Sequence, residues 1–171
     1  MKLFVTAVIA PLLGVIASPL WGQDSSSLSE ILSDSVQTVE GKKVEIEELE
    51  GKIVGLYFSA HWCGPCRLFT PVLAEFYETH KEQDFEIIFI SFDKSNTEKQ
   101  NYMREAGMKW LTMKGAGNRK AKQLAEEFQV QGFPTLLILD DSGKLITPNG
   151  RADVITSSET ALERWLETDP S

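Results

Sequence analysis

The chain has 171 residues, 42% of them hydrophobic, and its formal net charge at pH 7 is −8. A chain of this length can bury one core, so we expect a single domain, and no internal repeat is visible. The acidic balance argues against nucleic acid as a partner, because an acidic surface repels phosphate backbones and anionic membrane faces.

Residues 1–22 have the composition of a secretory signal: Lys2 supplies one positive charge, residues 3–16 are almost wholly apolar, and small residues follow. Cleavage is expected after Ala17 or after Gly22. The sequence therefore predicts export, with the bacterial periplasm as the expected compartment and secretion as the alternative. An uncleaved leader would instead anchor the protein to a membrane, because the uncharged stretch approaches the roughly 20 residues that span a bilayer.

The next segment, residues 23–35, is rich in serine and is expected to form a tether outside the core. Ser27 and Glu30 have the spacing of a capping box, which predicts one helical turn within it. The folded domain is then expected to begin with a small hairpin over residues 36–46, where apolar and polar residues alternate.

Apolar strands alternate with amphipathic helices along the rest of the chain. The expected strands are 53–58, 85–92, 135–139 and 144–146, and the expected helices are 63–77, 95–104, 121–129 and 161–166. Continuous apolar runs are typical of strands that are covered on both faces. This order predicts an α/β fold with a central mixed sheet and helices on both of its faces.

The chain has two cysteines, Cys63 and Cys66, at the junction of the strand over 53–58 with the following helix. A disulfide between them would close a loop too short to stabilise the fold appreciably. Unpaired backbone N–H groups at the start of a helix stabilise a thiolate, and open α/β sheets place their chemistry at the carboxyl ends of central strands. We therefore predict a redox centre with Cys63 as the nucleophile.

Metal binding is the alternative use of two such sulfurs, and no metal is expected. Only His61 and His80 could add soft ligands, and His61 is too close in sequence to complete a tetrahedron easily. We interpret His61 as a solvated surface residue and Trp62 as a recognition edge beside the reactive sulfur.

Short motifs make the chain similar to the thioredoxin superfamily. They are Trp62-Cys63-Gly64-Pro65-Cys66, Pro71 five residues later, and Gly132-Phe133-Pro134-Thr135 before a late strand. Residues 57–63 and 69–77 most resemble the tryparedoxin and nucleoredoxin branch. The resemblance implies a thioredoxin-like domain over residues 36–168, with an extra helix inserted before the strand that follows Pro134.

The same resemblance implies an oxidoreductase that reduces protein disulfides through a redox-active Cys63–Cys66 disulfide, without a bound cofactor. Cys63 would attack the substrate, Cys66 would resolve the mixed disulfide, and an upstream redox protein would donate electrons. It also implies a cis peptide bond before Pro134, facing the dithiol. The residues expected to shape the substrate site are Trp62, Gly64, Pro65, Phe133 and Pro134.

Two positions depart from the thioredoxin pattern. Thioredoxins carry a buried aspartate paired with a lysine on the neighbouring strand, and this chain has Tyr57 and Phe89 at those positions. The base that deprotonates Cys66 is therefore not identified, and water is the default candidate. Reductants and oxidants share the motif, so a disulfide oxidase or isomerase is one alternative, and a non-catalytic adaptor with the same fold is another.

Overall fold

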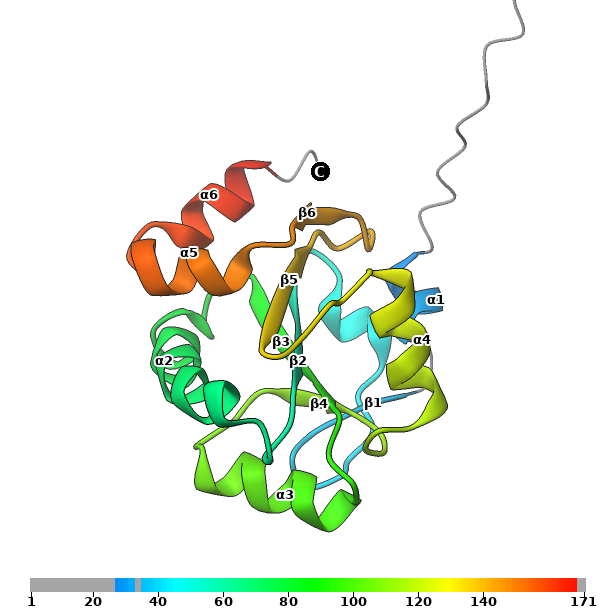
Figure 1. Cartoon of the computed structure of the whole chain (residues 1–171). Helices are drawn as coiled ribbons and strands as arrows, with labels where there is room; N and C mark the ends of the chain where they lie inside the picture. The colour runs from blue at the N-terminus through cyan, green and yellow to red at the C-terminus, as the bar shows by residue number, and fades with distance from the viewer. Residues whose placement is uncertain (1–26, 33–34, 169–171) are drawn as a thin grey trace, which may run out of the picture.

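Six strands form one mixed sheet in the computed structural model of the protein, which describes residues 27–32 and 35–168 (Figure 1). They are β1 (Val36–Gln37), β2 (Ile53–Ser59), β3 (Phe85–Ser91), β4 (Leu111–Met113), β5 (Thr135–Leu139) and β6 (Leu145–Thr147). Their order across the sheet is β1-β4-β3-β2-β5-β6. The pairs β2–β3 and β3–β4 are parallel, and β1, β5 and β6 join their neighbours antiparallel.

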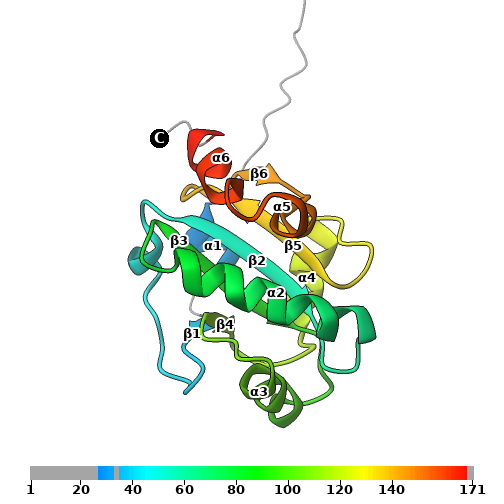
Figure 2. The same cartoon turned by 90° about the vertical axis from the view of Figure 1, so that its left-hand side faces the viewer.

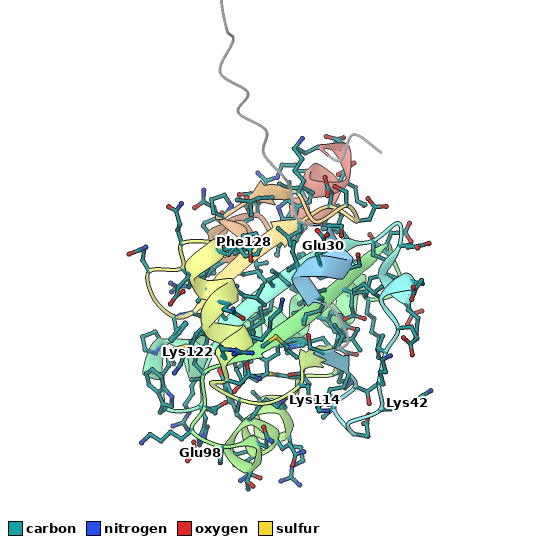
Figure 3. All side chains as sticks on the ribbon, turned by 90° about the vertical axis from the view of Figure 1, so that its right-hand side faces the viewer. Glu30, Lys42, Glu98, Lys114, Lys122 and Phe128 are labelled. Carbon is teal, nitrogen blue, oxygen red and sulfur yellow. A yellow bond between two sulfur atoms is a disulfide. The ribbon has the colours of Figure 1, made fainter. Side chains whose placement is uncertain are left out.

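Helices cover both faces of this sheet, as the sequence predicts (Figures 1 and 2). They are α1 (Leu28–Leu32), the 3-10 helix η2 (Ile46–Leu49), α2 (Gly64–His80), α3 (Asn96–Glu105), α4 (Arg119–Glu127), α5 (Gly150–Ser157) and α6 (Ala161–Thr168). Helices α2, α3, α5 and α6 pack on one face around Trp110 and Trp165. Helices α1, η2 and α4 pack on the other, which Figure 3 views, with Glu30 and Lys122 labelled.

The central strand β2 is apolar because both of its faces are covered, and all seven of its residues are buried. Successive side chains point to opposite faces, so Tyr57 packs in the first core and Phe58 in the second. Tyr57 is in register with Phe89 on β3, and their ring centroids are 6.0 Å apart. The two residues that replace the thioredoxin ion pair are therefore neighbours.

The tether prediction is wrong for the part of residues 23–35 that forms α1. Leu28, Ile31 and Leu32 are at most 4% exposed and pack into the second core. Their spacing is helical, so one apolar face is buried although the segment is rich in serine. The helical turn predicted from Ser27 and Glu30 is confirmed, but the helix belongs to the core.

The predicted leader, residues 1–22, lies outside the described residues together with both expected cleavage positions. Within the part of the chain that the structure describes, no helix combines the length and apolar character needed to cross a bilayer. The described fold includes α1, which precedes the domain boundary expected at residue 36.

Several short elements differ from the sequence prediction. Strand β4 was not predicted, because three residues are too few to show an alternating pattern. β1 pairs with β4, so the hairpin expected over residues 36–46 is reduced to a single bridge between Gln37 and Lys43. Helix α5 was also missed. The long segment between β3 and β5 holds two helices, α3 and α4, in agreement with the predicted insertion.

Candidate active site

A disulfide between Cys63 and Cys66 lies just beyond the carboxyl end of β2, where α2 begins. Cys63 is the N-cap residue of α2, and its Sγ accepts a hydrogen bond from the backbone N–H of Cys66 at 3.3 Å. Pro65 occupies the first turn, where its missing N–H leaves no helical carbonyl unpaired. In the reduced protein this N–H and the helix dipole would stabilise a thiolate on Cys63.

The two cysteines differ in exposure: Cys63 is 7% exposed, and Cys66 has no exposed area. An incoming disulfide can therefore reach Cys63 before Cys66. Gly64 and Pro65, which lie between them, are exposed, and a Cβ atom added to Gly64 would meet nothing within 4 Å. The surface over the dithiol is thus open to a substrate.

Aromatic residues from three segments surround the dithiol. The Phe133–Pro134 peptide bond is cis, as the resemblance implies, and the carbonyl oxygen of Phe133 lies 3.7 Å from Cys63 Sγ. The Phe133 ring packs against Phe92 at 4.6 Å and against the edge of Trp62 at 6.2 Å. Trp62 is 57% exposed, yet its Nε1 donates to the carbonyl of Phe92 at 3.0 Å. This fixed, exposed indole can contact a substrate with little further loss of rotamer freedom.

A buried carboxylate holds the loop that precedes the dithiol. Asp93 follows β3 and is 2% exposed, and its Oδ1 accepts a hydrogen bond from the backbone N–H of His61 at 2.7 Å. Its Oδ2 accepts from the Ser91 hydroxyl at 2.8 Å. Burial raises the pKa of the Asp93 carboxyl above its ordinary value, against these hydrogen bonds. The sequence analysis did not assign this role to Asp93, although Asp93 lies two residues after a strand that pairs with β2.

A hollow of about 330 Å³ opens beside Trp62. Within it, His61 Nε2 lies 3.3 Å from a carboxylate oxygen of Glu105, and the His61 ring packs on Tyr102 at 5.6 Å. His61 is therefore a partly buried and paired residue, which differs from the solvated residue that we expected. The residues that line it are His61, Trp62, Lys94, Glu98, Asn101 and Glu105.

A cluster of buried hydroxyl groups lies behind the dithiol. Thr70 Oγ1 donates to the carbonyl of Cys66 at 2.8 Å, and it lies 2.7 Å from Tyr57 OH and 2.5 Å from Tyr102 OH. Because a threonine hydroxyl has one proton, both tyrosines donate to Thr70. Burial raises the pKa of Tyr57 well above its ordinary value, so its hydroxyl stays neutral. Contacts between residues so far apart in sequence gave no signal that sequence analysis could use.

The second histidine considered for a metal site, His80, lies at the far end of α2 from the cysteines. The helical rise places it about 21 Å along the axis from Cys66, and its Nδ1 is hydrogen-bonded to the carbonyl of Phe76 at 2.8 Å. It cannot share a ligand set with the two sulfurs. Among the described residues, no three histidine, cysteine, aspartate or glutamate side chains are grouped so that they could hold a metal ion.

A mixed α/β sheet, a Cys-x-x-Cys pair at the start of a helix and a cis-proline facing it define the class of thioredoxin-fold redox proteins. A family model described as thioredoxin-like matches residues 51–145. The chain belongs to the thioredoxin-like family of oxidoreductases, near its tryparedoxin and nucleoredoxin branch.

Known proteins of both kinds are similar to this chain. Nucleoredoxin of Mus musculus is 38% identical over 147 residues, which cover 85% of this chain and 33% of the relative. Tryparedoxin of Trypanosoma brucei brucei is 39% identical over 125 residues, which cover 72% of this chain and 85% of the relative. The structure of tryparedoxin II from C. fasciculata matches with a TM-score of 0.73 at 36% identity, covering 80% of this chain and 92% of that one. The chain thus spans about a third of the nucleoredoxin and most of the tryparedoxins.

Proposed function

We propose that this protein is an exported reductase of protein disulfides that works without a bound cofactor. The observation that carries the proposal is the unequal exposure of the two sulfurs, with Cys63 accessible and Cys66 enclosed. The Cys63 thiolate attacks one sulfur of the substrate disulfide, and the other substrate sulfur leaves as a thiolate. Cys66 then loses its proton and attacks Cys63 Sγ, which releases the second substrate thiolate. The substrate gains two electrons, and the Cys63–Cys66 disulfide remains.

Two features support the reducing direction. Gly64-Pro65 resembles the sequence of reducing family members more than that of oxidising ones. A dithiol is a strong oxidant when its reduced form is strongly stabilised, and the buried Asp93 carboxylate close to the loop opposes a thiolate. Electrons would then return to the Cys63–Cys66 disulfide from an upstream redox protein.

Trapping tests the mechanism. A Cys66→Ser variant lacks the resolving sulfur, so disulfide-linked adducts through Cys63 should accumulate and should disappear on reduction. The Cys63→Ser/Cys66→Ser variant is the matched control and should form none. Absence of adducts from Cys66→Ser would favour the adaptor alternative.

Redox titration against glutathione tests the direction. A potential near the thioredoxin value of about −270 mV supports a reductase. A potential close to the value of about −120 mV, which belongs to strong oxidants, would replace the proposal with a disulfide oxidase.

The composition of residues 1–22 is the support for export. When the full chain is produced in a bacterial host, the protein from the periplasmic fraction should begin immediately after Ala17 or Gly22. A protein with an intact N-terminus in the membrane fraction would indicate an uncleaved anchor. Recovery of the intact chain in the cytosol would contradict export.

A further inference from the structure

Residues of α2 and of the two C-terminal helices line a trough, and Figure 2 views the side of the molecule on which these three helices lie. It consists of two hollows of about 510 and 610 Å³ that share His80 and Glu159 in their linings. We call it the α2–α6 trough. Its apolar lining residues are Val72, Phe76, Val154, Ile155, Leu162 and Leu166.

The trough holds half of the large apolar side chains that are exposed in the described part of the chain. Six large apolar side chains are exposed among the described residues, and three of them, Val72, Ile155 and Leu166, line it. Leu68, which is 79% exposed, precedes Val72 by one helical turn and extends the apolar strip toward the dithiol. α2 fills the core with its opposite face, and Val72, Ile155 and Leu166 belong to neither buried core cluster. Exposed apolar side chains that lie together, rather than singly, are candidates for a binding surface.

The charges around the trough all have one sign. Glu75, Glu159, Glu163 and Glu167 line it, and among its described lining residues there is no lysine or arginine. All four glutamates are exposed. Two arginines of the adjoining helices are engaged elsewhere: Arg164 pairs with Asp153 at 3.5 Å, and Arg151 lies 5.7 Å above the Phe69 ring. The trough therefore has an apolar floor and an acidic rim, and the rest of its lining is polar: Thr79, Gln83, Ser158 and the buried His80.

We propose that the α2–α6 trough binds a basic amphipathic helix of a partner protein. The apolar face of that helix lies on the floor, and its lysine and arginine side chains reach the four glutamates. A second copy of this chain fits poorly, because a symmetric pair would bring two sets of four glutamates together in a protein of net charge −8. The binding uses no sulfur and is separate from disulfide exchange.

A synthetic helix tests the proposal directly. The probe is a peptide of about five turns, with leucine along one face and lysine on the other, added to the oxidised full chain and followed by amide chemical shifts. We expect shift changes concentrated on α2, α5 and α6. A peptide with the same leucine face but glutamate in place of lysine should bind at least about tenfold more weakly.

Charge-reversal variants locate the contact. Glu75→Lys with Glu159→Lys should weaken binding of the basic peptide at least about tenfold, and Glu163→Lys with Glu167→Lys provides a second pair if the first disturbs folding. The matched control is Glu126→Lys with Glu127→Lys, two exposed glutamates of α4 on the other side of the sheet (Figure 1). The control should change affinity less than about twofold.

Three results would overturn the proposal. The first is a set of chemical-shift changes outside α2, α5 and α6, and the second is an equal loss of peptide affinity in the α4 control variant. The third is a dimer of the peptide-free protein that Ile155→Asp dissociates, since a second copy would then occupy the trough. Binding should persist in the Cys63→Ser/Cys66→Ser variant, which cannot exchange disulfides. Failure of the trough proposal and failure of the reductase proposal are therefore separate results.

Discussion

The carboxylate of Asp93 accepts a hydrogen bond from the backbone N–H of His61, with 2.7 Å between Oδ1 and N, two residues before Cys63. Asp93 is 2% exposed, so water screens its charge little. In thioredoxins the buried carboxylate lies on the strand before the dithiol, where this chain has Tyr57. Here a buried carboxylate lies at the end of β3 instead, beside the loop that carries the reactive cysteine.

The first prediction concerns the charge of Asp93. Asp93→Asn keeps an acceptor for the His61 N–H and removes the negative charge, so the pKa of Cys63 should fall by on the order of half a unit to one unit. The pH dependence of the alkylation rate of the reduced protein measures this. Glu98→Gln, at a partly exposed carboxylate of the neighbouring hollow, should have a smaller effect. An unchanged Cys63 pKa would limit Asp93 to holding the loop.

The second prediction concerns the buried hydroxyl cluster. Thr70 makes three hydrogen bonds within it, and Tyr57 makes one of these. At a net value of about 1 kcal/mol per bond, Thr70→Val should lower the free energy of unfolding by about 2–3 kcal/mol and Tyr57→Phe by about 1 kcal/mol. Urea unfolding of the two variants compares them. Equal losses would mean that Thr70 is not the centre of the cluster.

Local motifs explain why the dithiol and the cis-proline could be predicted. Trp62 to Cys66 form one contiguous motif, Phe133-Pro134 form another, and each lies next to a strand that a continuous apolar run reveals. The parallel pairing of β2 with β3 brings the chemistry to one edge of the sheet. For these residues, local sequence and fold class were sufficient to predict that they lie together at the active site.

Contacts between distant segments explain most of what was missed. α1 is buried because its three apolar residues find a second core built from strands and α4. β4 is a strand because β1 and β3 flank it, although three residues carry no period of their own. The acidic trough forms only when α5 and α6 are placed beside α2. In the sequence alone, its glutamates are therefore indistinguishable from ordinary solvated residues.

The third prediction concerns the contact of α5 with the sheet. A Cβ atom on Gly150 would lie 2.8 Å from Ile138 Cγ1 and 2.9 Å from the backbone oxygen of Leu136. The backbone of β5 cannot move aside easily, so Gly150→Ala should cost about 1–3 kcal/mol of stability. Gly132→Ala, where a Cβ would meet nothing within 4 Å, should change stability by less than about 0.5 kcal/mol. Equal urea midpoints would show that α5 shifts freely on β5.

The fourth prediction concerns Lys99, a lysine that is 2% exposed. Its Nζ donates to the carbonyls of Met113 at 2.9 Å and Gly115 at 3.1 Å. Burial lowers the pKa of Lys99 from its ordinary value of 10.5 to about 8. Above about pH 8 the unfolded chain therefore binds more protons at this group than the folded protein. By linkage, Lys99 makes the free energy of unfolding rise with pH in this window, as its buried charge is lost.

The pH range in which the effect of Lys99 can be measured ends near pH 10. Burial raises the pKa values of Tyr57 and Tyr77, so above about pH 10 they ionise in the unfolded chain but not in the folded protein, and this lowers the free energy of unfolding. Urea unfolding between about pH 8 and pH 10 should show a more positive slope of stability against pH for the wild type than for Lys99→Met, whose side chain does not titrate. Lys122→Met, at an exposed position of α4, should keep the wild-type slope. Parallel curves for the wild type and Lys99→Met would mean that the Lys99 ammonium keeps its proton throughout, held by the two carbonyls.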